Sequence, residues 1–148
     1  MSDFFMKEAL KQAMKAFMDG EVPVGSIVVL GEKIIGRGFN QPIKTNDPSA
    51  HAEIVALKEA ANFLNNYRLI GTKMYTTLEP CLMCVGALVH ARIEEVIFSA
   101  YDPKSGALES NGNLLESNFL NHRFSFQGGL LENESSSLLK NFFNDKRS

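Results

Sequence analysis

Apolar side chains in the first part of the chain recur with the period of a helix. Between Ser2 and Asp19 they are spaced three and four residues apart, which places them along one face of an amphipathic helix. Ser2 or Asp3 can cap the start of that helix, and Gly20 can end it. The pattern therefore predicts an N-terminal helix that buries one face.

Beyond this helix, strand and helix patterns alternate. Runs of β-branched and apolar residues bounded by turn residues predict five strands, at 26–30, 33–40, 73–78, 94–100 and, as an edge strand, 124–127. Helical periodicity predicts three further helices, at 50–65, 80–90 and 132–144. Pro, Asn and Asp make 41–49 a predicted loop, whereas 108–121 matches no pattern. Together these elements indicate a single α/β domain over 1–148, with layers around one mixed sheet of about five strands.

Composition and charge narrow the classes of function. The chain has 148 residues, of which 45% are hydrophobic and 22% are charged, as in ordinary globular domains. Its 15 Lys and Arg against 17 Asp and Glu give a net charge of −2. Domains that hold nucleic acid by a large uniform basic field are strongly positive, so this class is excluded. The net charge also argues against a protein that binds membranes by a polybasic patch.

Cysteine usage and the N-terminus predict a cytoplasmic protein. Cys81 and Cys84 are too close in sequence to join distant parts of the chain, which excludes a secreted disulfide scaffold. Charged residues interrupt the apolar N-terminal positions, so no signal peptide is predicted. The uncharged stretch 80–91 is too short to span a bilayer, and no membrane partner is expected.

Two short motifs carry candidate metal chemistry: His51-Ala52-Glu53 and Pro80-Cys81-Leu82-Met83-Cys84. One imidazole and two thiolates suit zinc, and they leave the fourth tetrahedral position open for water. Cys81 and Cys84 are three residues apart in the first turn of a predicted helix. Their sulfurs should therefore face the same way, and the helix dipole should favour the thiolate form.

The spacing of His51 and Glu53 restricts where they can lie. Two residues apart within a helix, side chains diverge by roughly 200°. They can converge only at the start of a helix, where Pro48 and Ser49 place them. The sequence thus predicts that two helix N-termini meet at one metal. Glu53 would then carry a proton from the attacking water to a ring nitrogen and later to a leaving amine.

The cysteine pair has two simpler interpretations, a structural zinc site and a redox pair. A structural zinc site needs a fourth ligand, for which the chain offers only His90 or His122. A redox pair gives no role to His51 or Glu53. The joint pattern favours a catalytic metal over both.

At these motifs the chain resembles the zinc-dependent cytidine and deoxycytidylate deaminase superfamily, and within it the bacterial tRNA-specific adenosine deaminases. The similarity covers nearly the whole chain, through 21–25, 38–42, 47–53, 66–69, 77–84, 121–123 and 142–143. The resemblance implies a three-layer α/β/α sandwich of the cytidine deaminase type. It also implies one zinc per subunit, with His51, Cys81 and Cys84 as ligands and Glu53 as general acid and base. The implied reaction converts the wobble adenosine of a tRNA anticodon stem-loop to inosine, in a homodimer with composite RNA grooves.

The same resemblance implies a set of substrate-binding residues: Asn40, Val24, Leu78, Asp102, Lys104 and Phe143. It places Phe142 and Phe143 on a terminal helix that flanks the anticodon loop. Asn40 would contact the flipped nucleotide, and Val24 and Leu78 would form apolar walls beside the base. Each also has a plain structural role open to it. Asn40 could satisfy a loop, Asp102 could form a turn, the two walls could be part of the core, and core packing explains at least one of the two phenylalanines.

Two departures from the family pattern bear on RNA binding. Tyr101 stands where many relatives carry Arg, and 109–121 holds two acidic residues and no basic one. We expect both departures to weaken contacts to phosphate. With a net charge of −2, they predict an enzyme that extracts one base from an unpaired loop and holds RNA by local positive patches.

Two other functions remain as alternatives. A deaminase of the same fold could act on a free base or nucleoside such as guanine or cytosine, although the segments 121–123 and 142–143 argue against this. A non-catalytic, zinc-stabilised RNA-binding module is the other alternative. Glu53 argues against it, because a structural zinc has no use for a proton carrier.

Overall fold

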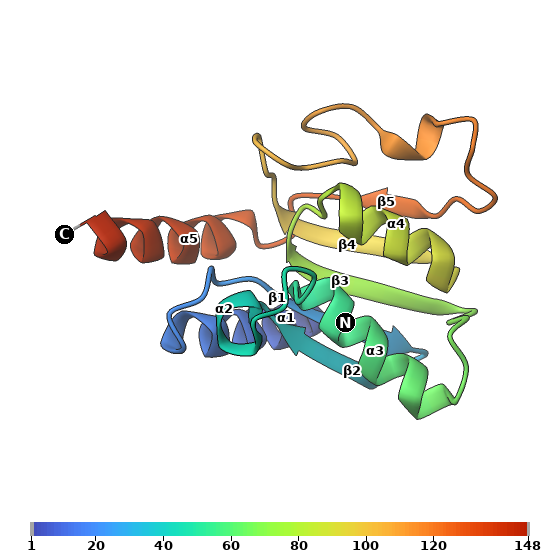
Figure 1. Cartoon of the computed structure of the whole chain (residues 1–148), viewed down its shortest axis with the longest axis horizontal. Helices are drawn as coiled ribbons and strands as arrows, with labels where there is room; N and C mark the ends of the chain where they lie inside the picture. The colour runs from blue at the N-terminus through green and yellow to red at the C-terminus, as the bar shows by residue number, and fades with distance from the viewer. Residues whose placement is uncertain (1, 148) are drawn as a thin grey trace.

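The computed structural model describes residues 2–147 and contains strands and helices in alternation (Figure 1). The strands are β1 (Gly25–Leu30), β2 (Lys33–Phe39), β3 (Thr72–Leu78), β4 (Glu95–Ala100) and β5 (Ser125–Gln127). The helices are α1 (Ser2–Met18), α2 (Pro42–Thr45), α3 (Ala52–Leu64), α4 (Leu82–Ala91) and α5 (Glu132–Arg147), with a 3-10 turn at η1 (Leu114–Glu116). No helix in residues 2–147 combines the length and the apolar character that a membrane crossing requires.

The five strands form one mixed sheet in the order β2-β1-β3-β4-β5. β1 pairs antiparallel with β2 and with β3, whereas β3, β4 and β5 run parallel. Parallel neighbours need a crossover connection, and α4 supplies it between β3 and β4. The predicted mixed sheet of about five strands is confirmed.

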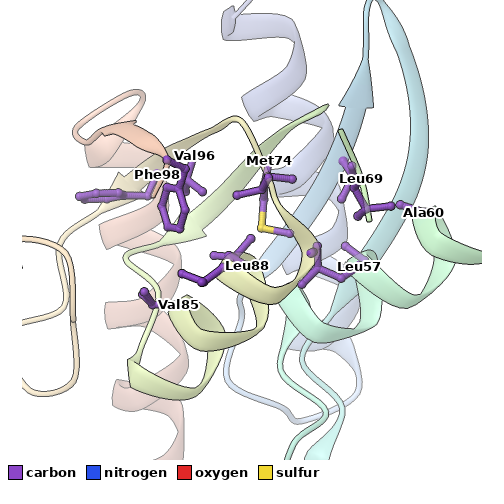
Figure 2. Close-up of a cluster of buried hydrophobic side chains, with 14 of the residues drawn as sticks. Leu57, Ala60, Leu69, Met74, Val85, Leu88, Val96 and Phe98 are labelled. Atoms are coloured by element: carbon purple, nitrogen blue, oxygen red, sulfur yellow. The ribbon is translucent and has the colours of Figure 1, made fainter. Parts of the chain in front are cut away.

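Helices cover both faces of the sheet. Successive side chains along a strand point to opposite faces, so each face carries apolar residues that a helix can bury. On one face, strand residues such as Met74, Val96 and Phe98 pack with Leu57 of α3 and Leu88 of α4, as Figure 2 shows. On the other face, Ile27, Tyr75 and Ile97 pack with Phe5, Met6 and Ala9 of α1. The expected three-layer α/β/α sandwich is therefore confirmed, and α5 extends past the ends of the strands (Figure 1).

Two glycines of β2 let α3 approach the sheet closely. A Cβ atom at Gly38 would lie 2.5 Å from the carbonyl oxygen of Ala52 and 2.5 Å from the amide nitrogen of Ala56. At Gly36 it would lie 2.4 Å from the carbonyl oxygen of Ala56. All three distances are far shorter than a van der Waals contact, so only glycine fits at these two positions. This close approach sets the position of the start of α3, which carries the first candidate motif.

The structure corrects several predicted boundaries. The predicted loop 41–49 contains the short helix α2, whose first backbone amides, at Ile43 and Lys44, donate to the carboxylate of Glu21. The helix predicted from residue 80 begins at Leu82, so Cys81 precedes it as the N-cap residue. α5 continues three residues beyond the predicted end, and 108–121 forms η1 and turns.

Candidate metal centre and active site

Three candidate metal ligands meet where the starts of α3 and α4 lie close together. His51 is the N-cap residue of α3 and Cys81 is the N-cap residue of α4, while Cys84 lies within the first turn of α4. The Nδ1 atom of His51 is 3.6 Å from the Sγ atoms of both cysteines. All three donor atoms lie within 4.8 Å of one another. Two helix N-termini therefore do meet at one cluster of donors.

The distances and chemistry of this cluster fit a zinc ion. Zinc bonds of about 2.3 Å to sulfur and about 2.0 Å to nitrogen, at tetrahedral angles, hold those two atoms roughly 3.5 Å apart. The observed separation of 3.6 Å for each sulfur is close to this value. Neither His90 nor His122 belongs to the donor group in residues 2–147. His122 instead donates through Nε2 to the carbonyl oxygen of Ile93, at 2.8 Å, so the four-ligand structural site is not formed.

Proton sharing within the cluster favours a thiolate. The hydrogen bond from the Cys84 thiol, and next that from His51, lower the pKa of Cys81 to about 4 against the cost of its burial. The same hydrogen bond to Cys81, with burial, raises the pKa of Cys84. The hydrogen bond to Cys81 also raises the pKa of His51. The lowered pKa of Cys81 favours its thiolate, which is the form that binds metal.

The carboxyl group of Glu53 is buried beside the three donors. The residue is only 4% exposed and lies in the first turn of α3. Burial raises the pKa of Glu53 to about 7, while a hydrogen bond with Cys84 acts in the opposite direction. A carboxyl group that titrates near neutrality can both accept and release a proton at working pH. Glu53 therefore has the position and the acidity that a proton carrier needs.

Asn40 supports the start of α3 from the end of β2. Its Oδ1 atom accepts a hydrogen bond from the backbone amide of Ala52, at 2.8 Å. Ala52 stands between His51 and Glu53, so this bond orients the helix turn that carries both. The simple role of satisfying a backbone group is therefore confirmed for the amide oxygen. The predicted contact of Asn40 with a nucleotide stays a prediction.

Four of the remaining predicted substrate residues line one groove. Leu78, Asp102, Lys104 and Phe143 border a groove of about 600 Å³. Other residues complete its lining: Val22, Tyr101, Pro103, Ser105, Leu139, Lys140 and Asn144. The groove combines apolar surface with two lysines, which suits an unpaired nucleotide with its phosphate.

Asp102 forms a turn as well as lining the groove. Its Oδ1 atom accepts hydrogen bonds from the backbone amides of Lys104, at 3.1 Å, and Ser105, at 3.2 Å. The turn-forming role that the sequence left open is therefore present, and it presents Lys104 at the groove.

Val24 and Phe142 are both buried in the core. Val24 is only 4% exposed, so the core role that the sequence left open is present, and its predicted place beside the base stays a prediction. Phe142 is 7% exposed and packs edge-on against Phe17, with ring centroids 5.9 Å apart. Phe143, by contrast, is 45% exposed and faces the groove. One phenylalanine of the pair is thus structural and the other is available to a ligand.

Sequence reasoning did not single out two buried carboxylates near the site. Glu21 accepts from the first amides of α2, and Glu79 accepts from the loop that follows β4. Both are 2% exposed. Their partners are mainly backbone amides distant in sequence, so no local motif could have revealed them.

Comparison with known proteins agrees with this geometry. Residues 1–100 match the model of the cytidine and deoxycytidylate deaminase zinc-binding region. The chain is 48% identical over 145 residues to the tRNA-specific adenosine deaminase of Aquifex aeolicus (strain VF5), covering 98% of this chain and 95% of that one. It is 42% identical to the tRNA-specific adenosine deaminase of Bacillus subtilis (strain 168), covering 98% of this chain and 90% of that one.

Solved structures of deaminases share the fold of this chain. A structure from a study of A-to-I editing by tRNA:A34 deaminases superposes with a TM-score of 0.89 at 39% identity, covering 91% of this chain and 98% of that one. Guanine deaminase from Bacillus subtilis superposes with a TM-score of 0.63 at 37% identity, covering 66% of this chain and 63% of that one. The chain belongs to the cytidine and deoxycytidylate deaminase family, and within it groups with the tRNA-specific adenosine deaminases.

Proposed function

We propose that this chain is a hydrolytic deaminase that converts the wobble adenosine of a tRNA anticodon to inosine. The observation that carries the reaction type is the buried carboxyl group of Glu53 beside a three-donor metal site. The substrate is supported by the relatives named above, which carry tRNA specificity in their names across nearly the full chain. Residues 1–148 would act as one deaminase domain.

His51, Cys81 and Cys84 would hold the zinc ion. When bound there, zinc would supply an activated water whose pKa is lowered to about 7. In the overall reaction, the C6–O bond to the water oxygen forms, the C6–N bond of adenosine breaks, and ammonia leaves. The catalytic work assigned to the protein is proton transfer.

Glu53 would move the protons of this reaction. Its carboxylate oxygen accepts a proton from the attacking water and passes it to the ring nitrogen next to C6. Glu53 then takes the second proton and delivers it to the departing amine. Burial supports both transfers, because it excludes bulk water and holds the pKa of Glu53 at about 7.

The groove that Leu78, Lys104 and Phe143 line would hold the nucleotides around the target base. Phe143 and Leu78 offer apolar surface for an unstacked base, while Lys104 and Lys140 offer charge to phosphate. Asn40, which accepts from the first amide of α3 through its oxygen, would donate from its amide nitrogen to the flipped nucleotide. An anticodon loop is already unpaired, so few phosphate contacts suffice to extract one base.

We further propose that the active form is a cytoplasmic homodimer. An apolar groove of about 360 Å³ runs between α3 and α4, and its lining includes Ile54, Leu57, Ala61, Tyr67 and Ala87. The exposed Tyr67 and Ile70 lie in the segment that follows α3. A second copy of the chain is the occupant that would cover this surface. Sedimentation of Tyr67→Asp should show a monomer, whereas Phe119→Asp, at another exposed aromatic residue, should leave the dimer intact.

The decisive experiment supplies purified protein with alternative substrates. A stem-loop with adenosine at the wobble position, free adenosine, guanine and cytosine are incubated separately, and ammonia and inosine are measured. The proposal expects release from the stem-loop only. Release from guanine or cytosine without release from the stem-loop would establish a free-base deaminase instead, and no release at all would overturn the enzyme assignment.

A further inference from the structure

Glu79 is a buried carboxylate at the end of β3, two residues before Cys81. It is 2% exposed. Its oxygens accept five hydrogen bonds from the loop that follows β4. The Oε2 atom accepts from the amides of Leu108 (3.2 Å), Glu109 (2.8 Å) and Ser110 (2.9 Å), and Oε1 accepts from the amide of Asp102 (3.1 Å) and the hydroxyl of Ser110. Four of the five donors are backbone amides, so the carboxylate organises the path of the loop itself.

The same loop is joined to the metal-ligand segment by its backbone. Gly106 forms a bridge with Cys81, and the amide of Ala107 donates to the carbonyl oxygen of Pro80 at 2.9 Å. Gly106 also lies directly against Glu79, since a Cβ atom there would be 2.3 Å from the carboxylate carbon. The loop thus packs so closely on the segment 79–81 that no residue larger than glycine fits at position 106.

This loop supplies one wall of the substrate groove. Asp102, Lys104 and Ser105 line the groove, and Asp102 is itself one of the residues bound by Glu79. Glu79 therefore connects the groove wall to the segment that ends in a metal ligand. Glu79 belongs to the ligand segment, and its carboxylate accepts from the amide of Asp102 in the groove wall. Hydrogen bonds to Glu79 therefore hold the groove wall at a set distance from the ligand segment.

We propose that Glu79 is a positioning residue for the deamination reaction. It holds the loop of residues 102–110 so that Asp102 and Lys104 meet the RNA while the target base reaches the metal centre. The proposal rests on the proposed function. Its energetic basis is that substrate binding is weakened when a contact must first be ordered, because the cost of ordering is subtracted from the binding free energy.

The variant Glu79→Gln tests the acceptor character of this group at nearly constant volume. Gln turns one acceptor oxygen into an NH2 donor, and both oxygens of Glu79 face donors. The less costly orientation places NH2 at the Oε1 position, where the Ser110 hydroxyl can rotate to accept. The amide of Asp102 then loses its acceptor. The disturbance is therefore directed at the groove wall.

Thr72→Val is the matched control. Thr72 lies at the other end of β3, is buried, and donates through its hydroxyl to the carbonyl oxygen of Leu69 at 2.7 Å. The Thr72→Val variant loses this one buried hydrogen bond at nearly constant side-chain shape. Residue 72 is far from the loop in sequence and does not line the groove. Any loss of function that reflects only a weaker fold should appear in both variants.

The measurements are zinc content, steady-state kinetics on the anticodon stem-loop, and amide hydrogen exchange. Glu79→Gln should keep one zinc per chain and raise KM by about tenfold with kcat changed by less than about threefold, as expected when ground-state and transition-state binding are lost together. Exchange should quicken in residues 102–110. Thr72→Val should keep the KM and the loop exchange of the original protein.

The outcomes separate the proposal from the function on which it rests. Unchanged KM and unchanged loop exchange in Glu79→Gln would overturn the positioning role, as would loss of zinc or equal effects in Thr72→Val. If the original protein does not act on the stem-loop, the proposed function fails, yet faster exchange confined to 102–110 would still support the link made by Glu79. If Glu79→Gln does not fold, Ser110→Ala, which removes one of the five bonds, decides by the same exchange measurement.

Discussion

The Nδ1 atom of His51 lies 3.6 Å from the Sγ atom of Cys84, although the two residues are 33 positions apart in sequence. His51 and Cys81 are the N-cap residues of α3 and α4, and each helix brings its first turn to this point. The close packing of α3 on Gly36 and Gly38 fixes one side of the pair. The packing of the two helix starts therefore sets the positions of the three donor atoms.

Removing zinc should abolish deamination while leaving the fold in place. The three-layer core consists of apolar residues of α1, α3, α4 and the sheet and does not depend on the metal. Zinc bound only by the native state adds stability in proportion to RT ln(1 + [Zn]/Kd). We expect a chelator to lower the melting temperature by about 5–15 °C for a domain of this size. Circular dichroism should show an unchanged spectrum at 25 °C, and added zinc should restore activity.

Two outcomes of zinc removal would contradict the proposed catalytic role of the metal. Complete unfolding on chelation would show that the metal is structural, and full activity in the metal-free protein would exclude it from the reaction. Addition of magnesium instead of zinc is the control, because two sulfurs and one nitrogen are poor ligands for that ion.

Glu53→Gln should retain zinc and lose turnover. Gln keeps the shape of the buried side chain but cannot carry a proton between water, ring nitrogen and amine. General acid–base groups contribute about 10²–10⁴-fold, and we expect kcat to fall by at least the lower figure. Single-turnover formation of inosine with saturating enzyme measures the chemical step directly. A normal rate in a zinc-loaded Glu53→Gln protein would rule out the proposed proton transfer.

Much of this site could be predicted from residue types and spacing. His51, Cys81 and Cys84 are soft or borderline donors that have few other uses in this combination, and the spacing of His51 and Glu53 required helix starts. The alternation of patterns likewise predicted the layers. These features are local, and local features can be read from the sequence.

The features that sequence reasoning missed depend on contacts between distant segments. α2 begins where the carboxylate of Glu21 accepts its first amides, and no pattern within 41–49 shows that partner. Glu79 likewise accepts from backbone amides of the loop after β4, which are distant from it in sequence. The burial of Val24, which is 4% exposed, also depends on packing between segments and not on its neighbours in sequence. The partners of buried acceptors and the burial of individual side chains therefore depend on tertiary contacts, which only the structure shows.

Gly38→Ala should destabilise the protein and impair the site. The added Cβ would meet the backbone of α3 at 2.5 Å, so the helix and its first turn must move. Overpacking of this kind costs about 1–3 kcal/mol. The control is Gly86→Ala in α4, where an added Cβ meets nothing within 4 Å. That variant should be stabilised by up to about 1 kcal/mol, since alanine is the better helix former. Denaturant unfolding of both variants measures the contrast, and equal stability of the two would contradict the close packing of α3.

The salt dependence of RNA binding should be shallow. The net charge of −2 and the groove lysines Lys104 and Lys140 allow only a few phosphate contacts. Each contact contributes about 0.9 or less to the slope of log K against log salt, so a magnitude below about 4 is expected. Fluorescence anisotropy with a labelled stem-loop between 50 and 300 mM salt, roughly, gives the slope. A steep dependence would show a larger basic surface than the groove supplies.

Neighbouring phenylalanines of α5 should have separable roles. Phe142 is 7% exposed and packs on Phe17, so Phe142→Ala should cost about 3 kcal/mol of folding stability. Phe143 is 45% exposed and lines the groove, so Phe143→Ala should leave the melting temperature nearly unchanged. It should instead raise KM for the stem-loop by about tenfold, because stacking on an aromatic ring contributes about 1–3 kcal/mol per base. Phe143→Tyr, which keeps the ring, should restore KM. Normal KM in Phe143→Ala would exclude this ring from the RNA contact, and a loss of stability equal to that of Phe142→Ala would make both residues structural.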